Sequence, residues 1–186
     1  MANLRQPNLR PRSFLGRFRN DHRGVAAIEF ALILPFLAIL YFGAIEVSLL
    51  ISADRKVTET ASVLADLVSR TATINAADMS NVFDASRALF EPYDVSTVQM
   101  RVTSLIEKNG VAQVDWSKGR NAVPRIVGDA VTLDAGVLPT NGSVIMAEIT
   151  YNYRSVLGFF LKDGMVLHET FYLRPRASDT VVWSNS

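Results

Sequence analysis

The longest feature of the chain is an apolar stretch near its amino end. Residues 25–52 read VAAIEFALILPFLAILYFGAIEVSLLIS, and their only charges are Glu29 and Glu46. At a helix rise of about 1.5 Å per residue, the apolar run 30–51 covers about 33 Å, which matches the hydrocarbon core of a bilayer. The pattern therefore predicts a transmembrane helix over residues 25–52.

A helical pattern continues beyond this stretch. One helix face is apolar at steps of three or four residues: Val57, Ala61, Leu64 and Val68. Charged residues occupy the other faces, which is typical of an amphipathic helix. We expect residues 53–74 to continue the transmembrane helix and to pack their apolar face on the domain that follows.

The remaining residues, 75–186, are expected to form an α+β domain. Asn75 and Asp78 have the spacing of a capping box, which predicts a short helix that ends at Glu91-Pro92. Alternating apolar and polar residues, or runs of β-branched and aromatic residues, predict four strands: 98–106, 111–116, 143–153 and 165–173.

The first two strands are joined by Asn109-Gly110, a typical turn of a β-hairpin. The predicted fold class is thus α+β. A long N-terminal transmembrane helix continues into an amphipathic helix, which packs against a small antiparallel sheet with one further short helix.

Residues 1–24 form a basic leader. Six arginines stand against one aspartate there, a local balance of 6 − 1 = +5, although the whole chain has a net charge of only +1. The positive-inside rule then places the N-terminus in the cytoplasm and residues 53–186, with the α+β domain 75–186, across the membrane. The arginines are expected to contact anionic lipid rather than nucleic acid. A cleaved secretory signal is the weaker alternative, because Ile51-Ser52-Ala53 is a poor cleavage site.

The composition and motifs give little support for an enzyme. The absence of cysteine excludes disulfides, thiolate metal sites and a cysteine nucleophile. The two histidines, His22 and His168, are predicted on opposite sides of the membrane, and no phosphate-binding or hydrolase motif is present. We therefore expect no catalytic residue, no metal site and no cofactor. An anchored envelope hydrolase that uses acids from residues 78–134 stays open as an alternative.

The acid near the start of the apolar stretch is unusual. A carboxylate at the centre of a membrane helix costs about 2.5–3.5 kcal/mol on insertion scales, and less near the interface, so Glu29 calls for a partner. If the chain were cut after Gly24, the new amine of Val25 would lie one helical turn from Glu29. That amine could pair with Glu29 of the same or an adjacent molecule.

Three other residues of this stretch have weaker signals. Glu46 is expected to reach the far membrane interface and to need no functional role. Pro35 removes one backbone hydrogen bond and is expected to bend or loosen the helix. Pro35 and Gly43 are candidates for helix packing.

The residues around Gly24 and Glu29 resemble the prepilin processing motif of type IV pilin-like proteins. More closely, residues 23–69 resemble the start of the TadE-like family, the minor pilin-like or pseudopilin components of Tad tight-adherence pili. The resemblance extends to Tyr151-Asn-Tyr153 and to Arg174-Pro-Arg176 near the carboxyl end.

This resemblance implies cleavage between Gly24 and Val25 by a prepilin peptidase, and a role in recognition or assembly for Glu29 and Phe30. It implies a structural function in pilus assembly, namely priming, capping or linking the pilus. The implied partners are other pilin-like subunits, the Tad assembly platform, the peptidase and inner-membrane lipid. An uncleaved scaffold or binding module of the cell envelope is the main alternative.

Overall fold

A computed structural model of the chain describes residues 23–159 and 161–185. The chain divides into two compact units, with the boundary between Gly43 and Ala44. The described part of the first unit is the beginning of helix α2, and the second unit holds the rest of α2 and all other elements. The predicted leader, up to His22, lies outside the described residues.

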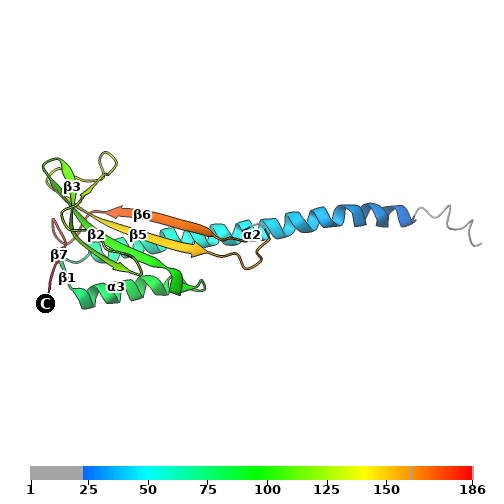
Figure 1. The fold of residues 1–186 in the computed structure, drawn as a ribbon, viewed down its shortest axis with the longest axis horizontal. Coiled ribbons are helices and arrows are strands. Elements are labelled where there is room, and N and C mark those ends of the chain that lie inside the picture. Colours follow the sequence, from blue (N-terminus) through cyan, green and yellow to red (C-terminus); the bar gives the residue numbers. More distant parts are fainter. Residues whose placement is uncertain (1–22, 160, 186) are drawn as a thin grey trace, which may run out of the picture. The chain divides into compact units, whose positions relative to one another are not determined.

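Helix α2 spans Arg23–Ser69, 47 residues, and confirms the prediction of one long N-terminal helix (Figure 1). Within the second unit its predicted apolar face is buried, with Leu64 and Val68 fully inaccessible to solvent. The helix ends at Ser69, before the predicted end at residue 74. The backbone amide of Arg176 donates a hydrogen bond to the carbonyl of Ser69 (2.8 Å) and so satisfies one of the last carbonyls of the helix.

Helix α3 spans Ala76–Ala88 and begins with the predicted capping box. The amide of Asp78 donates to the side chain of Asn75 (2.9 Å), and the amide of Asn75 donates to the carboxylate of Asp78 (3.4 Å). A short 3-10 helix, η1 (Val95–Thr97), leads from α3 into the sheet.

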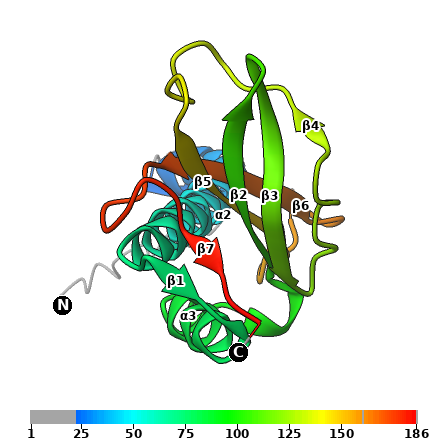
Figure 2. The ribbon, with the colours of Figure 1, turned by 90° about the vertical axis from the view of Figure 1, so that its left-hand side faces the viewer.

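Five strands form an antiparallel sheet in the order β4-β3-β2-β5-β6 (Figure 2). Their bounds are β2 (Gln99–Lys108), β3 (Val111–Arg120), β4 (Ala130–Val131), β5 (Ser143–Tyr153) and β6 (Met165–Leu173). The turn between β2 and β3 has positive φ at both Asn109 (57°) and Gly110 (78°), as the predicted hairpin turn requires. The predicted antiparallel sheet is thereby confirmed.

Both faces of the sheet carry buried side chains within the second unit. On one face, residues of α2, α3 and the sheet form the main core, in which Leu64, Phe90 and Ile149 are fully buried. On the other face, a smaller cluster around Leu105 and Met146 is covered by the connection from β3 to β5. This arrangement explains why nearly every residue of β5 is buried.

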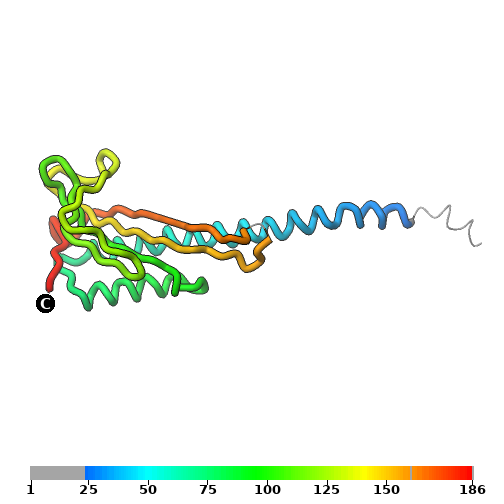
Figure 3. The backbone as a smooth tube through the Cα atoms, in the orientation of Figure 1, coloured from blue at the N-terminus to red at the C-terminus, as the bar shows by residue number. Residues whose placement is uncertain are grey.

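A two-stranded parallel pair, β1 (Thr73–Ile74) and β7 (Val182–Trp183), was not visible in the sequence pattern. It brings the carboxyl-terminal segment, red in Figure 3, beside the end of α2 and the start of α3. The indole of Trp116 donates to the carbonyl of Val181 (2.7 Å) and joins this segment to the sheet. The long helix is thus held at its carboxyl end by the last residues of the chain.

Candidate functional site

The predicted processing residues lie in the first turns of α2. The helix already includes Gly24, so Val25 and Glu29 lie one turn apart on the same helix face. Among the described residues, the space around Gly24 is open, because a Cβ atom added there would meet no side chain and no backbone outside its own helical turn within 4 Å. Glu29 and Phe30 are both solvent-exposed, and among the described residues no hydrogen bond or ion pair involves Glu29.

The first unit presents apolar side chains with almost no cover from the protein itself. Phe36 is 73% exposed and Leu40 is 70% exposed. Pro35 lies inside α2, and the helix continues through it. Gly43 is half-buried at the end of this unit. The helix therefore has a bilayer-length surface that requires a non-aqueous environment or neighbouring helices.

Glu46 differs from its sequence-based expectation. Its side chain is only 1% exposed, and its Oε1 accepts a hydrogen bond from the backbone amide of Leu161 (3.3 Å). Leu161 belongs to the connection between β5 and β6, 115 residues further along the chain. Glu46 thus joins α2 to the β domain. The residues around Glu46, 44–52, give no sign of this role, because its partner is distant in the sequence.

A second buried carboxylate, that of Glu148, lies on the face of the sheet opposite α2 and α3. Arg101 donates two hydrogen bonds to Glu148, from Nε (2.7 Å) and Nη2 (2.6 Å), and Arg125 donates from Nη2 (2.9 Å). Burial opposes ionisation of Glu148, but the hydrogen bonds and charges of the two arginines outweigh it and lower the pKa of the carboxyl group. Arg125 comes from the β3–β5 connection, so this cluster fastens that connection to the sheet.

Several acids of the predicted hydrolase region have structural partners. Asp78 and Asp94 cap α3 and η1, and Asp84 pairs with Arg120. In the part of the chain that the structure describes, no group of three or more acids and histidines could hold a metal ion. His168 lies exposed on β6, where its ring contacts the hydroxyl groups of Thr150 (2.8 Å) and Thr170 (3.3 Å).

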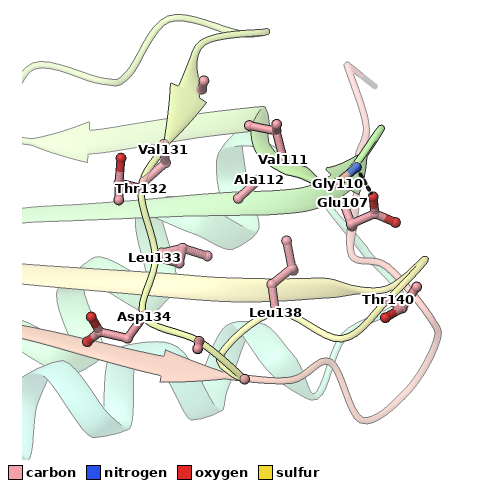
Figure 4. A pocket seen from close by; sticks show the side chains of 13 residues that line it. Glu107, Gly110, Val111, Ala112, Val131, Thr132, Leu133, Asp134, Leu138 and Thr140 are labelled. Carbon is pink, nitrogen blue, oxygen red and sulfur yellow. Dashed lines mark hydrogen bonds between the residues drawn. The ribbon is translucent and has the colours of Figure 1, made fainter.

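A pocket of about 480 Å³ lies beside the β2–β3 turn (Figure 4). Glu107 lines one side of it and accepts hydrogen bonds from the backbone amides of Gly110 (2.5 Å) and Asn141 (2.8 Å). These two bonds lower the pKa of Glu107. Asp134 lies on the other side, well separated from Glu107 in Figure 4. The pocket thus pairs no two acids for catalysis, and Glu107 serves to hold two loops together.

The family model described as TadE-like protein matches residues 24–66. Residues 24–66 are TadE-like. This confirms the resemblance that the sequence indicated over this part of the chain. No curated protein and no solved structure matches the chain. TadE-like proteins are structural components of pili, so the match and the apolar helix fit a membrane protein associated with a Tad pilus.

The TadE-like segment contains most of α2 and begins at Gly24. Among the described residues, α2 is the one helix long and apolar enough to cross a membrane, which indicates anchoring by a single pass. The match does not reach Arg174-Pro-Arg176. The structure gives that segment a local role, because Arg176 caps α2 through Ser69 and forms an ion pair with Asp66 (3.3 Å).

Proposed function

We propose that the protein is a pilin-like subunit that acts in the assembly of a Tad-type pilus, where it primes, caps or links the fibre. The proposal rests on two observations that concern the same part of the chain. The TadE-like match begins at Gly24, and the helix that follows exposes a bilayer-length apolar surface. A surface of this kind serves insertion into lipid and later packing against other helices of the same kind.

The proposed topology has four parts. Residues 1–24 form the cytoplasmic leader, 25–52 cross the inner membrane, 53–74 link the span to the domain, and 75–186 lie outside the cytoplasm. The six arginines of the leader support this orientation. The buried apolar face of α2 in the second unit supports packing of this part of the helix against the domain.

We further propose that a prepilin peptidase cleaves the bond between Gly24 and Val25. The open space around Gly24 and the exposure of Val25 are compatible with access to this bond from a membrane enzyme. Cleavage would convert the amide of Val25 into an ammonium group. Glu29, one helical turn away, is a suitable partner because the described residues offer it no other hydrogen bond or ion pair.

In the assembled fibre, the carboxylate of Glu29 would meet the amine of Val25 in an adjacent subunit and set the axial register between helices. Phe30 is 59% exposed beside Glu29 and would contribute to recognition. Pro35 and Gly43 would shape the helix for close packing, since both remove material or hydrogen bonding from the helix surface.

Mass spectrometry of the protein extracted from native membranes tests the processing step. The proposal predicts a mature amino terminus at Val25, and a Gly24→Leu variant that keeps its leader. Gly43→Ala is the matched control, because it changes a glycine of the same helix away from the cut, and it should be processed normally. An intact leader on the natural protein would favour the uncleaved scaffold.

Pilus assembly by cells that carry Glu29→Gln tests the structural role. We expect assembly to fail in this variant and to persist with Glu59→Gln, which changes an exposed acid further along the same helix. Normal pili with Glu29→Gln would contradict the proposal. Measurable turnover of an envelope substrate by the full-length protein would instead favour the hydrolase.

A further inference from the structure

The connection between β5 and β6 is described for residues 154–159 and 161–164, and it exposes apolar side chains between charged residues. Val156 is 89% exposed and Phe159 is 60% exposed, while Arg154 and Lys162 are exposed on either side of them, and Asp163 is exposed next to Lys162. The combination of apolar side chains and nearby cations is typical of segments that lie at a membrane surface.

This loop is held against α2 at a defined level. The amide of Leu161 donates to the buried carboxylate of Glu46, and Figure 1 shows the loop, in orange, beside α2. The return into β6 is tight, because a side chain at Gly164 (φ 74°) would come within 2.5 Å of the carbonyl oxygen of Tyr153. The loop is thus anchored at Leu161 and at its junction with β6.

The level of Glu46 can be compared with the charges on α2. On the exposed face of the helix, Val47 and Ile51 are apolar, and the first exposed charges of the second unit are Asp54 and Arg55. Eight residues separate Glu46 from Asp54, which corresponds to about 12 Å along the helix axis. The loop therefore meets α2 on the apolar side of these charges.

The length of the membrane span indicates the same position along α2. A helix that enters the hydrocarbon core at Val25 reaches the other side after about 20 residues, at an average core thickness of about 30 Å. This places the end of the core near Ile45 and residues 46–52 of the proposed span in the interfacial layer, so the apolar run 30–51 extends about six residues beyond the core. Val47 and Ile51 would then lie in that layer, together with the loop.

We propose that the β5–β6 loop inserts its apolar tip into the outer interfacial layer of the membrane that α2 crosses. Lipid is its occupant: Val156, Leu157 and Phe159 contact the upper acyl chains, and Arg154 and Lys162 contact anionic headgroups. The loop also covers Glu46, so that this carboxylate does not face the lipid of the interfacial layer. This inference rests on the membrane anchoring proposed above.

Site-directed spin labelling tests the inference with the full-length protein in vesicles of phosphatidylethanolamine and phosphatidylglycerol. The chain has no cysteine, so single-cysteine variants can be labelled at one position each. Val156→Cys and Phe159→Cys probe the loop, and Phe36→Cys probes the apolar span. Val111→Cys is the matched control, because this exposed valine pairs with Lys108 at the opposite end of the sheet.

Accessibility of each label to oxygen, relative to a water-soluble nickel chelate, is the readout. We expect labels at 156 and 159 to prefer oxygen more than the label at 111, and less than the label at 36. If 36 prefers oxygen but 156 and 159 behave like 111, the loop inference is wrong and the anchoring stands. If 36 behaves like 111, the anchoring itself fails. Labels at 156 and 159 that are shielded from both reagents would report a protein neighbour and would also overturn the lipid assignment.

Discussion

The two halves of α2 show how one helix can serve two different environments. Leu40, in the first unit, is 70% exposed, whereas Leu64, in the second unit, is fully buried against the sheet and α3. Both are leucines in one continuous helix, so local propensity does not distinguish them. The difference lies in what covers each half: the second is covered by the protein's own domain, and the first requires lipid or other helices.

The acidic residues repeat this contrast. Glu46 and Glu148 are buried, and each has hydrogen-bond donors from distant parts of the same chain. Glu29 is exposed on the apolar half, and the described residues provide it with no such donor. These two acids of the second unit are therefore structural, while the acid of the first unit is left for a partner from outside the chain.

The largest expected effect is on the core of the domain. Leu64→Ala should lower the free energy of unfolding by about 3 kcal/mol, because a fully buried leucine leaves a cavity when it is truncated. Leu40→Ala should leave that free energy unchanged, since the domain does not cover Leu40. Urea unfolding of the full-length protein in nanodiscs, followed by fluorescence of Trp116 and Trp183, measures both. Equal losses in the two variants would remove the distinction between the halves of α2.

The next effect concerns the carboxylate between two arginines. Glu148→Gln should lower the free energy of unfolding by about 2 kcal/mol. This is less than the 3–5 kcal/mol expected when a fully buried ion pair is broken, because Arg101 and Arg125 are partly exposed. Asp84→Asn is the control and should cost at most about 0.5 kcal/mol, since Asp84 pairs with Arg120 at the surface.

The same cluster predicts a dependence on pH. The pKa of Glu148 is lower in the folded protein than in the unfolded chain, so its contribution to stability is present above the unfolded pKa. It is lost as the pH falls through the lowered folded pKa. Unfolding curves of the natural protein and of Glu148→Gln should therefore converge in acid, and a constant difference across that range would contradict the assigned ionisation.

A smaller loss of stability is expected from a change at the junction of α2 with the β5–β6 loop. Glu46→Ala removes the acceptor of the Leu161 amide and should cost about 1–2 kcal/mol. Glu59→Ala removes only a pair with Lys56 on the exposed surface and should cost at most about 0.5 kcal/mol. Thermal unfolding of both variants in nanodiscs, and proteolysis within residues 154–164, are the measurements. Equal stability and equal cleavage in the two variants would show that Glu46 does not hold the loop.

Features governed by local patterns could be predicted from the sequence. The capping box at Asn75, the turn at Asn109-Gly110 and the apolar face of α2 around Leu64 all depend on residues within a few positions of one another. Period and turn chemistry determine these elements, so the helices and the four long strands could be located.

Features that depend on distant partners could not be predicted. The burial of Glu46 depends on Leu161, and the end of α2 depends on Arg176. Strands β1 and β7 have two residues each, too few for any periodic signal. For the candidate site, the sequence indicated Gly24 and Glu29 through their spacing, but their roles depend on molecules outside the chain and stay predictions.

Cysteine accessibility along α2 in native membranes tests the central claim most directly. Leu32, Phe36 and Leu40 are exposed in the structure, as are Asp54 and Glu59. Variants with a single cysteine at each of these positions would be treated with a water-soluble maleimide. If lipid or neighbouring helices cover the first half of α2, cysteines at 54 and 59 should react and those at 32, 36 and 40 should not. Equal reaction at all five positions would contradict the account of α2 as a membrane anchor.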